Sequence, residues 1–82
     1  MSEIYSQISE AVQHGKVKDV KEYISQAIDS GLPAKDILEK GLLDGMNIIG
    51  EKFKNNEVYV PEVLIAARAM NAGTALIKPL LA

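Results

Sequence analysis

The 82-residue sequence predicts an all-α protein, an antiparallel four-helix bundle that forms a single domain over residues 1–82. Two observations carry this prediction. Apolar residues recur every three or four positions in four segments, and each segment is bounded by the glycine, proline or polar residues that end helices. The connections between the segments are short, so successive helices are expected to run antiparallel.

The first two helices are expected over residues 2–13 and 18–30. In both segments the apolar residues fall on one helical face and the charged residues on the other. Ser2 is placed to cap the first helix. Gly15 and Gly31 follow the two segments and are expected to end them, because glycine adopts a left-handed conformation without steric cost.

A long third helix is expected over residues 33–54, with Pro33 at its first position. Gly41, Gly45 and Gly50 interrupt it, although glycine destabilises a helix interior by ~1 kcal/mol relative to alanine. The first two of these glycines lie one turn apart on one face. This spacing favours the close approach of another helix, and a kink is the alternative.

The last helix is expected to begin at Pro61 and to run to about Lys78, before Pro79. A polar turn at residues 54–57 precedes it, and the β-prone stretch 58–60 is too short for a strand of typical length. Apolar residues surround this helix on nearly every side. We therefore expect it to be buried on more than one face.

Composition excludes several classes of function. The net charge is −2 with both signs scattered, so the sequence offers no basic surface for nucleic acid. Uninterrupted apolar stretches are far shorter than the ~20 residues that span a membrane, and the start of the chain lacks the pattern of a signal peptide. With no cysteine in the chain, a cytoplasmic location is the simplest expectation.

Few residues could support catalysis, and we expect neither a catalytic residue nor a metal site. His14 is the only histidine and lies in a polar turn, as a solvated residue at a helix end would. Asp36 and Glu39 belong to a charged helix face beside lysines. Asp44 has apolar neighbours, so it is a candidate for a hydrogen bond to backbone or to a partner group.

Apolar residues flank the polar turn between the last two helices. They are Phe53, the only phenylalanine, on one side and Val58, Tyr59 and Val60 on the other. One interpretation is a hydrophobic staple that fixes the turn. The other is an apolar lid over a large flat ligand or a partner.

Three segments of this region, residues 41–53, 60–63 and 66–70, resemble the helical cap domain of corrinoid proteins. This domain occurs in methyltransferase-associated corrinoid carriers and in the cobalamin-binding region of methionine synthase. The resemblance covers essentially the whole chain. It implies a four-helix bundle that sits over the corrin ring and shields the methyl group on cobalt.

The resemblance also implies specific contacts and partners. Phe53 and Val60 would face the upper ligand of the cobalt, and Val63 and Leu64 would add cofactor-binding contacts. The cap would be a non-catalytic module of a carrier that exchanges methyl groups with cognate methyltransferases. A related group of light-sensing regulators tends to carry Trp at the position of Phe53 and Glu-His near the start of the last helix, so this sequence departs from it.

The family's following α/β domain, with an Asp-x-His-x-x-Gly motif that ligates cobalt, has no counterpart in these 82 residues. His14 lies in the wrong domain to replace that ligand. We therefore expect this chain alone to bind cobalamin weakly or not at all, and to self-associate through its uncovered apolar surfaces. The alternatives are a helical protein-interaction domain and the cap of a cobalamin-dependent sensor.

Overall fold

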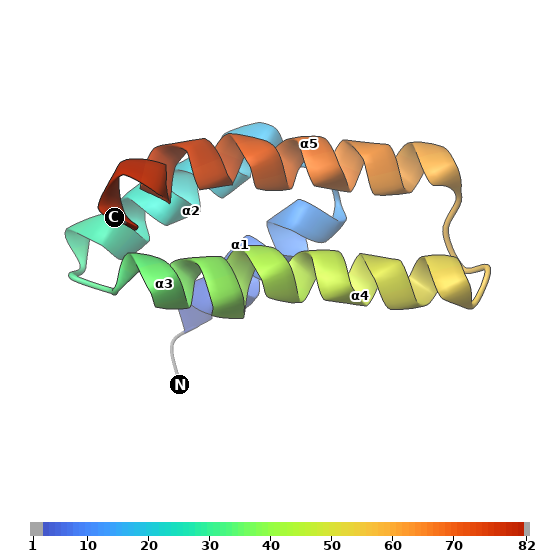
Figure 1. Cartoon of the computed structure of the whole chain (residues 1–82), viewed down its shortest axis with the longest axis horizontal. Helices are drawn as coiled ribbons and strands as arrows, with labels where there is room; N and C mark the ends of the chain where they lie inside the picture. Colours follow the sequence, from blue (N-terminus) through green and yellow to red (C-terminus); the bar gives the residue numbers. More distant parts are fainter. Residues whose placement is uncertain (1–2, 82) are drawn as a thin grey trace.

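The computed structural model describes residues 3–81, and helices account for most of them. No strand occurs in this range, which confirms the all-α prediction; Ser2 lies outside it. The helices follow one another with short connections (Figure 1). They are α1 (Glu3–Gln13), α2 (Val17–Asp29), α3 (Ala34–Asp36), the π-helix η1 (Ile37–Leu42), α4 (Leu43–Lys54), α5 (Val60–Ile77) and the 3₁₀ helix η2 (Lys78–Leu80).

The bundle consists of two antiparallel hairpins, α1–α2 and α4–α5, stacked as two layers (Figure 1). Helix α1 runs parallel to the continuous η1–α4 helix. A Cβ atom placed on Gly41 would lie 2.9 Å from the Ile8 side chain, and one on Gly45 would lie 2.9 Å from Val12. These contacts confirm the close helix approach that the sequence predicts at the two glycines.

Helix α2 runs parallel to α5 in the same way. Gly15, in the turn before α2, lies against Ile65, and Gly73 lies against Val20 and Ile24. Successive long helices therefore alternate in direction, as predicted, whereas the helices that face each other across the two layers are parallel.

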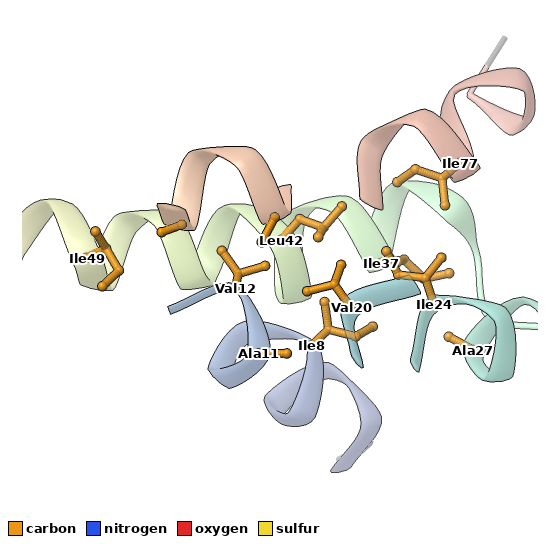
Figure 2. Close-up of a cluster of buried hydrophobic side chains, with 12 residues drawn as sticks. Ile8, Ala11, Val12, Val20, Ile24, Ala27, Ile37, Leu42, Ile49 and Ile77 are labelled. Carbon is orange, nitrogen blue, oxygen red and sulfur yellow. The ribbon is translucent and has the colours of Figure 1, made fainter. Parts of the chain in front are cut away.

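The core lies between the two layers, and its buried hydrophobic side chains within residues 3–81 are aliphatic. Ile8, Ile24, Ile37, Leu42 and Ile77 are fully buried. Figure 2 shows most of these side chains converging from both hairpins. Among the residues that the structure describes, the buried hydrophobic ones are Ile8, Ala11, Val12, Val20, Ile24, Ala27, Ile37, Leu42, Ile49, Ala66, Ala69 and Ile77.

The third predicted helix is continuous from Ala34 to Lys54 but contains the π-helical segment η1. A π-helix has i→i+5 hydrogen bonds and therefore holds more residues per turn than an α-helix. Of the two alternatives for the glycine-rich helix, close packing is the one observed, at Gly41 and Gly45, and the helix separately adopts π-helical hydrogen bonding at Ile37–Leu42.

Helix α5 differs from its prediction in burial. The expectation of burial on more than one face is wrong, because only one stripe is buried: Ala66, Ala69, Gly73 and Ile77. Small residues form most of this stripe, which brings the α5 backbone close to α2. The larger apolar residues on the other side of α5 face solvent.

The two glycines predicted to end helices follow α1 and α2 as expected, whereas Pro33 precedes the third helix as its N-cap and does not fill its first position. Gly15 and Gly31 have φ angles of 67° and 83°, values that favour glycine. Asn56 also has a positive φ, 63°, in the turn between α4 and α5. Helix α5 begins at Val60, one residue earlier than predicted.

Candidate functional site

The α4–α5 hairpin extends beyond the α1–α2 hairpin (Figure 1). The α1–α2 turn lies against Ile65 at Gly15, and α1 lies against α4 at Gly45. Helix α4 continues from Gly45 to Lys54, about two and a half turns further. We call this projecting end of the α4–α5 hairpin, residues 50–64, the tip.

Hydrogen bonds order the turn of the tip. The backbone N–H of Tyr59 donates to Oε1 of Glu62 at 2.9 Å, which caps the start of α5. The backbone N–H of Glu57 donates to the carbonyl of Lys52 at 2.7 Å, which closes the end of α4. The tip therefore presents its side chains from a defined backbone.

Three of the four predicted cofactor-binding residues are exposed at this tip. Phe53 is 45% exposed, Val60 54% and Leu64 64%. Val63 is placed differently, since it is half-buried and packs against the core. Large apolar side chains that face solvent on an ordered turn are typical of a binding surface.

The start of α5 shows which residues occupy the staple positions. With Tyr59 as the residue that caps α5, Val58 and Val63 occupy the two positions of a hydrophobic staple, and both are half-buried. Phe53 and Val60 are left free of that structural role. The sequence alone could not show which residues occupy the staple positions, because these positions are counted from the residue at which α5 begins.

The other candidate residues have structural surroundings. Ser9 Oγ donates a 2.7 Å hydrogen bond to Asp44 Oδ2, so the partner of Asp44 is a helix side chain. Asp36 forms an ion pair with Lys40 at 3.7 Å on the predicted charged face. His14 is exposed and borders a shallow groove between α1 and α2. Within residues 3–81, no three His, Asp or Glu side chains are grouped to hold a metal ion.

One segment meets the length and hydropathy criteria of a membrane span. Val60–Leu80 is 21 residues long, with a mean hydropathy of 1.2. The expectation that every apolar stretch is too short overlooked it, because Glu62, Arg68 and Lys78 divide a segment whose average hydropathy remains high. Its buried stripe packs in the bundle, and Val60 and Leu64 of the tip are among its exposed residues.

A four-helix bundle with an exposed apolar tip defines a helical binding module, and the chain belongs to the B12 binding domain family. The family model matches residues 4–78. The resemblance noted in the sequence is therefore confirmed at the level of family and fold.

The similar proteins include corrinoid proteins of Methanosarcina species. Monomethylamine corrinoid protein 2 of Methanosarcina acetivorans is 32% identical over 78 residues, which cover 95% of this chain and 36% of that protein. The trimethylamine corrinoid protein of Methanosarcina barkeri is 36% identical over 77 residues, 94% of this chain and 36% of that protein. This chain thus spans about a third of the length of these relatives.

Two solved structures share the fold. The Methanosarcina barkeri monomethylamine corrinoid protein superimposes with a TM-score of 0.90 at 32% identity, covering 94% of this chain and 36% of that one. A chain of the methanol:cobalamin methyltransferase complex from Methanosarcina barkeri gives a TM-score of 0.88 at 27% identity, covering 95% of this chain and 30% of that one.

Proposed function

We propose that this chain is the cap module of a corrinoid methyl-carrier protein and covers the upper face of methyl-cobalamin between methyl transfers. The observation that carries the proposal is the exposure of Phe53, Val60 and Leu64 on a hydrogen-bonded tip. These side chains have no burial partner sufficient to cover them within residues 3–81. A flat apolar-faced ligand would bury them.

The residues of the tip fit a corrinoid. The methylated cofactor supplies a methyl group bound to cobalt, which needs an environment without water or competing ligands. Phe53, Val60 and Leu64 have no donor atom for a metal, so they would exclude water without coordinating. Val63 would support them from the core rather than touch the ligand directly.

The longer protein would be a carrier rather than a catalyst. Its remaining length would hold the α/β domain that binds the corrinoid from below, and its partners would be cognate methyltransferases in the cytoplasm. This part of the proposal follows from the family and from relatives of which this chain spans about a third. Transfer requires the cap to move aside, which favours a modest interface between tip and ligand.

A chimera tests this function directly. The chain would replace the matching 36% of the Methanosarcina barkeri monomethylamine corrinoid protein, which shares its fold. The methylated corrinoid form would be illuminated and the rate of photolysis compared with that of the same protein without a cap. The chimera should protect the methyl group, and Phe53→Ala should move the rate toward the cap-free value.

Leu76→Ala is the matched control, because Leu76 is 39% exposed on α5 but lies toward the opposite end of the helix from the tip. It should leave photolysis unchanged. Equal rates for the chimera and the Phe53→Ala variant would contradict the cap function. In that case the alternative is a helical protein-interaction domain, for which the tip would be a docking surface for another protein.

A further inference from the structure

Gly50 has no structural reason to be a glycine within the described bundle. It lies in the interior of α4, is exposed, and an added Cβ atom would meet nothing within 4 Å. Gly41 and Gly45 differ, since Cβ atoms there would lie under 3 Å from α1. A glycine in an exposed helix interior destabilises the helix relative to alanine, so Gly50 carries a cost that the packing of residues 3–81 does not explain.

The position of Gly50 connects it to the tip. Gly50 precedes Phe53 by three residues and follows Met46 by four, so the three lie on one side of α4. Across the hairpin, Val60 and Leu64 are one turn apart on α5, and both are exposed. The missing side chain therefore lowers the surface of α4 next to the exposed Phe53.

We infer that Gly50 is a specificity-determining residue of the tip, which lets a flat ring system lie close to the α4 backbone beside Phe53. The inference rests on the proposed function and adds a residue to it. A side chain at position 50 would hold a rigid ring away from the helix, whereas glycine leaves a shallow recess that a planar corrin can cover.

Rigidity makes a single methyl group matter. An added Cβ would project about 1.5 Å from the backbone, a full carbon–carbon bond length. A planar ring cannot bend around it and would tilt or lift as a unit. When a ring lies only 0.5–1 Å too far away, each dispersion contact loses roughly a quarter to a half of its energy. Because the ring moves as a unit, its contacts with Phe53 would weaken too.

Substitutions at position 50 should therefore have opposite effects on stability and on protection. In the 82-residue chain, Gly50→Ala should raise the melting temperature by a few degrees, because it favours the helix and meets open space. In the chimera, the same substitution should accelerate photolysis of the methylated corrinoid by about threefold or more. Gly50→Leu should accelerate it further while the chain remains folded.

The control is Asn47→Ala, which changes an exposed residue of α4 that lies before the tip and should leave photolysis unchanged. The inference would be overturned if the Gly50→Ala protein were more stable and still protected the methyl group fully. It would also be overturned if Gly50→Ala lowered the melting temperature, because the glycine would then be needed for folding. If Phe53→Ala lowers protection and Gly50→Ala does not, the cap function stands and only the role of Gly50 fails. If neither changes protection, the cap function fails as well.

Discussion

The Ser9 hydroxyl donates a 2.7 Å hydrogen bond to the Asp44 carboxylate, and this bond joins α1 to α4 beside Gly45. Ser9 is 3% exposed, and its oxygen also accepts a 3.2 Å hydrogen bond from the Gln13 amide. The hydroxyl thus donates one hydrogen bond and accepts another, in a region where the two helices approach too closely for a larger side chain. It is the only polar or charged residue that is buried in the described part of the chain.

This bond should contribute measurably to stability. Ser9→Ala should lower the free energy of unfolding by about 1 kcal/mol, the usual net value of a hydrogen bond. Asp44→Ala should have a similar effect. In urea unfolding, the double variant should cost less than the sum of the two single variants, since both remove the same interaction. Strict additivity would show that the pair does not interact in solution.

Gly45 and Gly73 should differ in their tolerance of alanine. A Cβ atom at Gly45 would lie 2.6 Å from the backbone oxygen of Ser9, which cannot move without shifting α1. At Gly73 the nearest atoms, at 2.7–2.8 Å, are the ends of side chains, which can rotate. Gly45→Ala should therefore destabilise the chain by about 1–3 kcal/mol, and Gly73→Ala by less. Chemical denaturation of both variants checks this order.

Gly15 should be intolerant of substitution for two separable reasons. Its φ of 67° disfavours any L side chain by about 1–2 kcal/mol. In addition, a Cβ atom would overlap the Ile65 side chain. Ile65→Ala should therefore rescue part of the stability lost in Gly15→Ala, and the backbone cost should remain. If Ile65→Ala gives no rescue in thermal unfolding, the steric contact is not a source of the loss.

The isolated chain should self-associate through its exposed apolar residues. Leu64 on α5 is 64% exposed and Leu80 in η2 is 55% exposed, and association would bury both. Sedimentation at millimolar concentration should detect species larger than a monomer, and Leu64→Ser together with Leu80→Ser should reduce them. A strict monomer at that concentration would contradict the prediction.

Helix positions were largely predictable because local chemistry determines them. Gly15 and Gly31 end α1 and α2, and Pro61 lies in the first turn of α5, so each boundary falls within about two residues of its expected place. The spacing of Gly41 and Gly45 also revealed a close helix contact, because two small residues one turn apart form a flat surface.

Other features depend on tertiary structure and left no local signal. The π-helical segment could not be recognised, since the apolar residues and glycines of this helix are compatible with both α-helical and π-helical spacing. Gly73 was missed because its neighbours on α5 are also small. The burial of α5 on one face only could not be inferred from composition, because an apolar side chain looks the same whether the bundle or an outside ligand covers it.

At the candidate site, Phe53 and Val60 were identifiable from the sequence as apolar residues beside a polar turn, whereas Leu64 was expected only from the resemblance to corrinoid cap domains. The half-buried placement of Val63 could not be predicted, because it depends on the residue at which α5 begins. Gly50 was grouped with Gly41 and Gly45, and only the packing shows that nothing in the described bundle approaches it.

The π-helical segment has a consequence for the direction in which the tip points. A π-helical segment holds more residues per turn than an α-helix, so deleting one residue within Ile37–Leu42 would be absorbed by a change to α geometry, and Phe53 would keep its direction. A deletion within the regular part of α4 would not be absorbed in this way and would turn Phe53 by about 100° around the helix axis relative to α1. The π-helical segment is therefore the part of the long helix that can lose a residue without redirecting the tip.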